Sequence, residues 1–435
     1  MNWILDIPME TRLAVLFLAG VMAGALVNLA IDLLGWQPKG RSPWSPLHPR
    51  DGGSRWLDRL PVLGWLRLAR KADVLGPRFW VRPLCLELLT GALVAGLYWW
   101  EIGNEGLLGR PLLPGGGVGE FSIQTWTILH VVYASHVLLV LLMLVASFID
   151  IDDRIIPDSI TVPGTLAALV LSGTYTWNLM PGGLQAKPSF QFVEFVTLVF
   201  PSLFPEQWPP ILKGFPQPIS LLLGLACFWG WCLALLPRLW LPSRGFDTAV
   251  RMLVAHAMRS PVWPLLVTIA LAGTTFIVAA WFIGLPNWAG LLTSLVGLAM
   301  SGGLVWGVRI VGTWALKKEA MGFGDVTLMA MIGSFLGWQA GLMIFFLAPF
   351  AGVVVGVARL LLRREREFPY GPFLCLATLA VIVGWRPLWD WLVPLFDQGL
   401  LVPLALLVCL AVLALLLWSW RIVTEALTHA RKQAP

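Results

Sequence analysis

The chain has 435 residues, of which 58% are hydrophobic and only 12% are charged. This composition excludes an ordinary water-soluble domain and predicts an all-α, polytopic integral membrane protein. The net charge of +6 is expected of basic loops beside anionic lipid and does not indicate a nucleic-acid partner. The five cysteines form no C-x-x-C pair, which argues against a disulfide framework or a zinc ribbon.

Ten apolar stretches have roughly the 20 residues that are needed to cross a hydrocarbon core of about 30 Å. They lie at about 12–34, 83–100, 126–149, 158–178, 219–237, 262–283, 288–311, 340–360, 370–390 and 400–420. A shorter stretch at 326–338 is counted as a further crossing, because a short helix can tilt or thin the bilayer locally. We therefore expect about 10–11 transmembrane helices. The first lacks a basic leading region, so we expect it to remain as a helix.

The basic residues orient these helices, because Lys and Arg accumulate in cytoplasmic loops. With the N-terminus outside and eleven crossings, the basic loops all fall on the cytoplasmic side. They are 35–82, 238–261, 312–324, 361–369 and the C-terminal tail. The pattern predicts a multi-pass membrane protein whose basic loops face the cytoplasm.

The chain divides into three parts. Residues 1–105 form a helix pair joined by a basic loop, residues 126–390 carry two acidic motifs, and residues 400–435 form an extra helix with a basic tail. We interpret about 179–286 as an insertion into the middle part, because its two apolar spans preserve the sidedness of the helices after it. No internal repeat is visible, which weakens an inverted-repeat transporter as an interpretation.

Two acidic motifs interrupt this apolar sequence. Asp150 closes the third apolar stretch, and Asp325 follows a Gly-Phe-Gly tripeptide far downstream. Ionisable groups beside lipid are costly and usually mark function. Peptide hydrolysis by carboxylates requires two that share one proton, so that one activates water while the other polarises the carbonyl. Because both motifs face the cytoplasm, we expect Asp150 and Asp325 to form such a catalytic pair.

Neighbouring residues have supporting roles in this interpretation. Gly322 and Gly324 permit backbone angles and close approaches that a side chain would forbid. Asp158 is placed to cap the following helix. Asp152 would lie about 200° around a helix from Asp150, so a direct role and a solvated one both stay open.

At these motifs the sequence resembles the type IV prepilin peptidases, which are intramembrane aspartic proteases of the GxGD kind. The segment at 86–91, Leu-Glu-Leu-Leu-Thr-Gly, is similar to the family's Val-Glu-Leu-Leu-Thr-Gly. In all, six segments match in the family's order, at 20–32, 57–66, 86–91, 150–158, 319–325 and 368–374. A lone Gly-x-Gly-Asp is a weak signal, whereas six ordered segments are specific.

The resemblance implies cleavage of the basic leader of type IV prepilins or pseudopilins, just before their apolar helix, in pilus assembly or protein secretion. The family's two catalytic aspartates fall on Asp150 and Asp325. Its motifs also contain the residues that we assign as supporting, namely Gly322, Gly324, Asp152, Asp158 and Glu319. The peptidase reaction needs no cofactor. Many members also methylate the new N-terminus with S-adenosylmethionine.

The sequence departs from the family pattern in three places. The family's first cytoplasmic loop often carries two C-x-x-C pairs, but this loop has no cysteine, so we expect no zinc or other metal site; methylation by S-adenosylmethionine stays open. The family's Lys two positions after the second aspartate is Thr327 here. The 175 positions from Asp150 to Asp325 exceed the family's usual gap, and the insertion accounts for the excess.

Two other functions stay open. The scaffold could be a catalytically inactive anchor for pilus or secretion assembly, as the cysteine-free loop and Thr327 suggest, although both aspartates and both glycines are intact. An ion-coupled transporter could use the same carboxylates as proton or cation sites, but it would predict broken helices and repeats.

Overall fold

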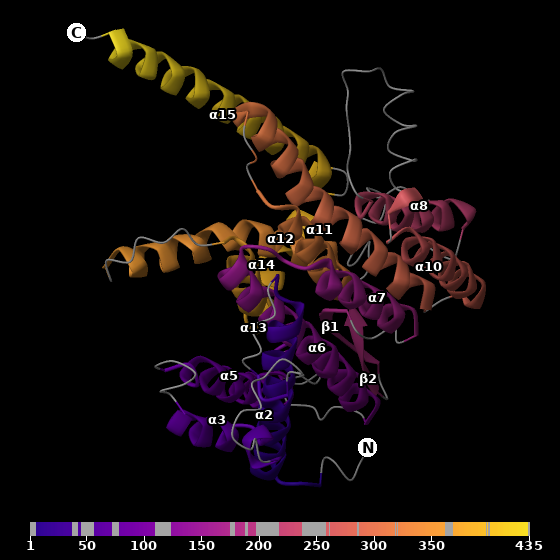
Figure 1. The fold of residues 1–435 in the computed structure, drawn as a ribbon. Helices are drawn as coiled ribbons and strands as arrows, with labels where there is room; N and C mark the ends of the chain where they lie inside the picture. Colours follow the sequence, from indigo (N-terminus) through magenta and orange to yellow (C-terminus); the bar gives the residue numbers. More distant parts are fainter. Residues whose placement is uncertain are drawn as a thin grey trace.

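The computed structural model is built almost entirely of helices (Figure 1). The structure describes residues 6–36, 42–44, 56–71, 78–108, 123–174, 179–187, 190–196, 217–236, 258–260, 262–284, 287–317, 319, 321–361, 369–396, 398 and 401–433. Its α-helices are α2 (Met9–Leu34), α3 (Leu63–Leu68), α5 (Val81–Tyr98), α6 (Ile123–Asp153), α7 (Asp158–Thr174), α8 (Pro218–Ala234), α10 (Trp263–Ile283), α11 (Asn287–Leu316), α12 (Phe323–Leu361), α13 (Gly371–Val383), α14 (Trp385–Phe396) and α15 (Leu401–Gln433).

Every one of the ten expected apolar stretches coincides with one of these helices, except that the stretch at 370–390 is divided between α13 and α14. Seven described helices are long and apolar enough to cross a membrane, and an eighth crossing results if the bent pair α13 and α14 is one span. The chain is therefore an all-α, polytopic integral membrane protein. The number is below the 10–11 expected, in part because α7 and α8 have only 17 residues each.

Two expected spans belong to one helix. The stretches at 326–338 and 340–360 are the two halves of α12, which leaves helical geometry at Gly337, where φ is 86°. A straight helix of these 39 residues would be roughly 58 Å long, about twice the hydrocarbon thickness. Glycine permits the break because it has no Cβ to oppose a positive φ. A second break separates α13 from α14, which are bent by 92° relative to each other.

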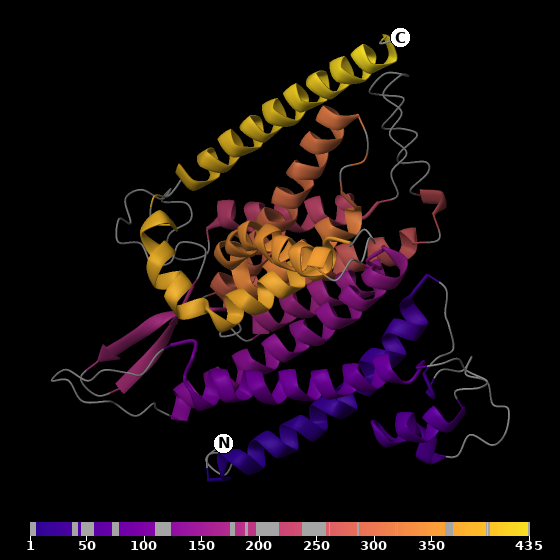
Figure 2. The ribbon, with the colours of Figure 1, turned by 90° about the vertical axis from the view of Figure 1, so that its left-hand side faces the viewer.

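The helices form three groups (Figures 1 and 2). The amino-terminal helices α2, α3 and α5 lie on one side, with α2 packed along α5. The middle of the molecule contains α6, α7, α11, α12 and α13, and α8 packs on α11 and α10. The final helix α15 lies on the far side from α2 and contacts α11.

Glu87 on α5 fixes the described part of the first basic loop to the helix pair. Its carboxylate accepts hydrogen bonds from the Val62 amide at 2.6 Å, the Trp65 indole at 2.8 Å and the Asn28 amide group at 3.2 Å. Glu87 is buried, and buried carboxylates are tolerated when they are hydrogen bonded in this way. The motif Leu-Glu-Leu-Leu-Thr-Gly therefore supplies a structural anchor.

A β-hairpin within the expected insertion was not predicted. Its strands β1 (Pro181–Lys187) and β2 (Phe190–Phe195) pair antiparallel and stand at the edge of the helices (Figure 2). The Trp385 indole at the start of α14 donates a 2.6 Å hydrogen bond to the carbonyl of Pro181. Since α13 and α14 lie in the expected peptidase part, this bond ties the hairpin to it.

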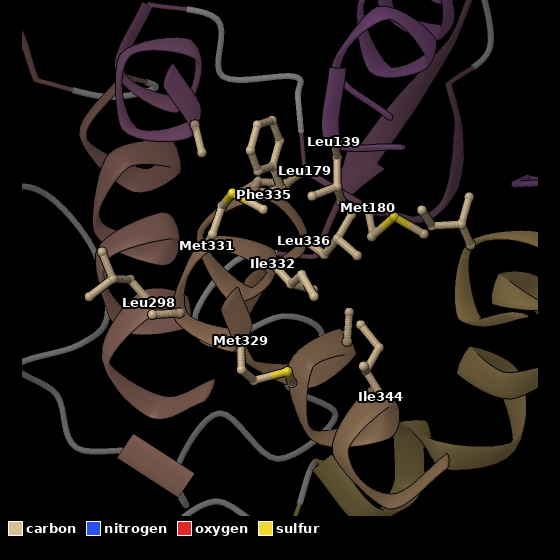
Figure 3. Packing of buried hydrophobic residues seen from close by; sticks show 14 of the residues in the cluster. Leu139, Leu179, Met180, Leu298, Met329, Met331, Ile332, Phe335, Leu336 and Ile344 are labelled. Atoms are coloured by element: carbon tan, nitrogen blue, oxygen red, sulfur yellow. The ribbon is translucent and has the colours of Figure 1, made fainter. Parts of the chain in front are cut away.

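The core is centred on α12. Met329, Met331, Phe335 and their neighbours on α12 pack against residues of α6 and α11, including Leu139 and Leu298 (Figure 3).

Helices α11 and α12 also cross very closely. A Cβ on Gly297 would lie 2.1 Å from the Gly333 carbonyl oxygen, and one on Gly333 would lie 2.3 Å from that of Gly297. Small residues at helix crossings let backbones approach in membranes, where packing replaces the hydrophobic effect.

This crossing predicts that Gly297→Ala destabilises the protein. The added methyl group would collide with backbone, and overpacking of this kind costs about 1–3 kcal/mol. Thermal unfolding in detergent, followed by tryptophan fluorescence, should show a lower midpoint than for the wild type. Gly356→Ala on α12 is the control, because no heavy atom of the described part of the chain lies within 4 Å of its Cβ position. Equal midpoints for the two variants would contradict the close crossing.

Candidate active site

Asp150 lies in the last turn of α6. The helix ends at Asp153, and Arg154 follows with a positive φ of 57°, a conformation that commonly terminates helices. The chain then turns through residues 155–157 into α7, which begins at Asp158. Asp150 is 4% exposed. The first motif therefore places one carboxylate at a buried helix end.

A backbone amide from another helix holds this carboxylate. Gly371, the first residue of α13, donates its N–H to Asp150 Oδ2 at 3.2 Å. A Cβ at Gly371 would lie only 2.5 Å from that oxygen, so the contact requires glycine. Sequence reasoning placed Gly371 in a family-like segment and gave it no role. The signal was a glycine at a predicted helix start, whose partner lies 221 residues away in sequence.

Asp325 lies in the first turn of α12, which begins at Phe323, and is 7% exposed. The partial positive charge of a helix N-terminus stabilises a carboxylate at this position. Gly324 brings this turn against the first motif, because its Cβ position lies 2.8 Å from the Cβ of Ile156. The expected close approach at Gly324 is thus made by Ile156. The Gly322 Cβ position lies 3.7 Å from Asp325 Oδ2.

The two motifs line one cavity of about 650 Å³. Both carboxylates, Arg154, Asp158 and Tyr370 are among its lining residues, and Asp150 and Asp325 are close enough to interact electrostatically. Among the described lining residues there is no serine, threonine, cysteine or histidine. The side chains that can move protons here are therefore carboxylates and one phenol.

Tyr370 precedes α13 and faces the same cavity. Burial, with a smaller contribution from the negative charge of Asp325, raises the pKa of Tyr370 to about 12. The phenol therefore keeps its proton at neutral pH and remains a hydrogen-bond donor.

The other expected site residues separate into two groups. Asp158 and Gly322 line the cavity with the aspartates, and the Asp158 carboxylate is hydrogen bonded to the Thr327 side chain. Asp152 and Glu319 are not among the cavity's lining residues. Asp152 pairs with Arg82 on α5 at 2.6 Å, as its position on the opposite face of α6 suggests.

Arg309 on α11 was missed by sequence reasoning. It forms an ion pair with Glu319, donates from Nε to the Met321 carbonyl at 2.8 Å, and places its guanidinium 5.7 Å from the centre of the Phe323 ring. These contacts hold the turn that presents Asp325. In the sequence, Arg309 is one basic residue near the end of the apolar stretch at 288–311. The expected cytoplasmic end of that stretch already accounted for its positive charge.

The described residues include no group of three or more His, Cys, Asp or Glu side chains that could hold a metal ion. The first basic loop contains no cysteine. The residues present therefore do not provide the four-ligand zinc site that thiolates would form.

Comparisons with known proteins show which proteins the chain is similar to. A profile described as the type IV leader peptidase family matches residues 253–357, which contain Arg309 and the Gly-Phe-Gly-Asp motif but not Asp150. This part of the chain is therefore similar to the type IV leader peptidase family. The match begins inside the segment expected as an insertion. Helix α8 therefore lies outside the match, whereas α10 lies within the match.

Curated relatives carry the name prepilin leader peptidase/N-methyltransferase. One from Aeromonas salmonicida is 33% identical over 160 residues, which are 30% of this chain and 53% of the relative. Others are from Pseudomonas aeruginosa, 35% identical over 104 residues (21% and 36%), and Burkholderia pseudomallei, 27% identical over 150 residues (34% and 47%). The chain thus spans about half the length of the first of these relatives. No solved structure matches the chain.

The Arg309 contacts predict that Arg309→Leu loosens residues 319–325. The variant removes hydrogen bonds from a charged donor, each worth about 1.5–3 kcal/mol, so amide hydrogen exchange in this segment should be about tenfold faster or more. The control is Arg386→Leu, which removes an exposed pair with Asp390 that should contribute little. Unchanged exchange in Arg309→Leu would mean that the turn holds its conformation without Arg309.

Proposed function

We propose that this protein is an intramembrane aspartic endopeptidase that removes the basic leader of type IV prepilins or pseudopilins. The observation that carries the proposal is that Asp150 and Asp325, from helices far apart in sequence, line one cavity. The match of residues 253–357 to the leader peptidase profile and the names of the relatives support this substrate class.

The proposed reaction uses the two carboxylates as a unit that shares one proton, because two adjacent negative charges resist simultaneous ionisation. The ionised carboxylate takes a proton from water as the oxygen attacks the scissile carbonyl. The protonated carboxylate gives its proton to the carbonyl oxygen. Collapse of the tetrahedral intermediate breaks the C–N bond, and the leaving nitrogen takes the proton that the first carboxylate removed from water. The second carboxylate regains its proton from the intermediate's hydroxyl as the carbonyl forms again. Tyr370 is a neutral donor that can orient the substrate carbonyl.

We place the cavity at the cytoplasmic face of the bacterial inner membrane. The carboxyl end of α6 and the amino end of α12 meet at the cavity. The basic segment 312–324 leads into α12, and the basic segment 361–369 leads into α13, whose first amide contacts Asp150. A precursor whose basic leader stays in the cytoplasm would present its cleavage site at this depth.

Methylation of the new N-terminus is a second activity carried in the relatives' printed name. It would require S-adenosylmethionine, for which we assign no residues. The inactive scaffold and the ion-coupled transporter are the alternatives, and buried carboxylates alone would suit a transporter. The peptidase is favoured because Arg309, Gly371 and the α12 N-terminus all position the two carboxylates at one cavity.

The proposal predicts that Asp150→Asn and Asp325→Asn each abolish cleavage, by about a thousandfold or more. The chain is co-expressed with a prepilin that has a Gly-Phe junction, and loss of the leader is followed by mass spectrometry. Asp153→Asn is the control, because Asp153 accepts a 2.9 Å hydrogen bond from the Trp36 amide and is not among the cavity's lining residues.

The same spectra decide among the alternatives. A product heavier by one methyl group would establish the methyltransferase activity. A wild type that is correctly inserted but leaves several cognate precursors uncut would contradict the peptidase and favour the scaffold or the transporter.

A further inference from the structure

A second cavity, of about 370 Å³, lies beside the candidate active site between α8, α11 and α12. Phe323 lines both cavities, so the two cavities adjoin at this side chain. Thr327 lines the second cavity and is hydrogen bonded to Asp158, which lines the first. We call this second cavity the α8 groove. Its position makes it continuous with the place where the scissile bond would lie.

The α8 groove is apolar and lined largely by small residues. The glycines and alanines are Ala226, Gly230 and Ala234 on α8, Ala299, Gly302 and Gly303 on α11, and Ala330 on α12. Those on α8 are spaced by four positions and therefore lie on one face of the helix. Small residues at this spacing allow another helix to approach closely within a membrane. No charged residue is among the described lining residues.

Two of these glycines face open space. Among the residues that the structure describes, none has a heavy atom within 4 Å of the Cβ position of Gly230 or of Gly303. Gly302, by contrast, faces Ala330 on α12, with its Cβ position 2.8 Å from the Ala330 Cβ. The glycine at 302 is thus explained by packing between α11 and α12, whereas those at 230 and 303 leave room for another molecule.

We propose that the α8 groove binds one face of the substrate's apolar helix while the scissile bond lies at Asp150 and Asp325. This inference rests on the proposed function. A precursor cut just before an apolar helix must place the first turn of that helix next to the carboxylates. The helix then needs an uncharged surface that begins there, and the α8 groove begins at Phe323. Helix α8 forms one wall of this groove, and its side chains would therefore contribute to selection among precursors.

Filling the groove tests the proposal. Gly230→Leu and Gly303→Leu should each lower kcat/KM for an intact precursor in proteoliposomes by about tenfold or more, since excluding two or more buried methylene groups costs this much. Gly356→Leu is the matched control, because it adds the same side chain at an equally open glycine that does not line the α8 groove. Melting temperatures identify any variant that fails to fold.

A photo-crosslinking experiment identifies the occupant directly. The precursor carries a benzophenone side chain at successive positions of its apolar helix and is mixed with full-length Asp325→Asn, which does not consume it. Mass spectrometry should locate adducts within 218–234 and 298–306, from precursor positions that repeat every three or four residues. Gly230→Leu in the same background should reduce these adducts, and Gly356→Leu should not.

The outcomes separate the two proposals. A wild type that leaves the precursor uncut contradicts the proposed function. A wild type that cuts, with Gly230→Leu and Gly303→Leu as active as Gly356→Leu, overturns the groove alone. Reduced activity without adducts on α8 also overturns it, because the groove would then hold a lipid acyl chain.

Discussion

Burial of two carboxylates among apolar helices is the constraint on which this structure depends. A carboxylate removed from water must find hydrogen-bond donors or favourable dipoles, or its burial costs several kcal/mol, as roughly estimated for unpaired charges. Helix ends are where a membrane protein has unpaired backbone donors to offer. Asp150 accepts from the first amide of α13, and Asp325 lies in the first turn of α12. Three helix termini therefore meet at one cavity.

Helix α11 supports this meeting point without contributing a carboxylate. Its close crossing with α12 at Gly297 fixes the position of the catalytic helix along its length. Arg309, about three turns further along α11, holds the turn before Asp325 through Met321 and Phe323. Between these two positions, Gly303 lines the α8 groove. One helix thus links the packing of the core, the geometry of the site and the surface proposed for the substrate.

Hydrophobicity predicted the helices well because it is a local property of the sequence. All ten apolar stretches are helical, and Asp150 and Asp325, which were predicted to lie together, line one cavity. The break at Gly337, the bend after α13 and the hairpin at 181–195 were not predicted, because each depends on neighbours that are distant in sequence. Arg309 and Gly371 were missed because their roles depend on backbone contacts that a residue's own type does not reveal. Arg309 donates to the Met321 carbonyl, and Gly371 donates its backbone N–H to Asp150.

Thr327 shows how the groove and the site constrain each other. Its hydroxyl donates to the Gly324 carbonyl at 3.1 Å, and its side chain is also hydrogen bonded to Asp158. It lines the apolar α8 groove, where a lysine would place a charge that is costly to bury. A neutral side chain therefore keeps the groove compatible with an apolar helix. The positive charge that lines the candidate active site is supplied instead by Arg154, immediately after the helix that carries Asp150. The departure from the family's lysine is thus compatible with both the proposed peptidase and the proposed role of the α8 groove.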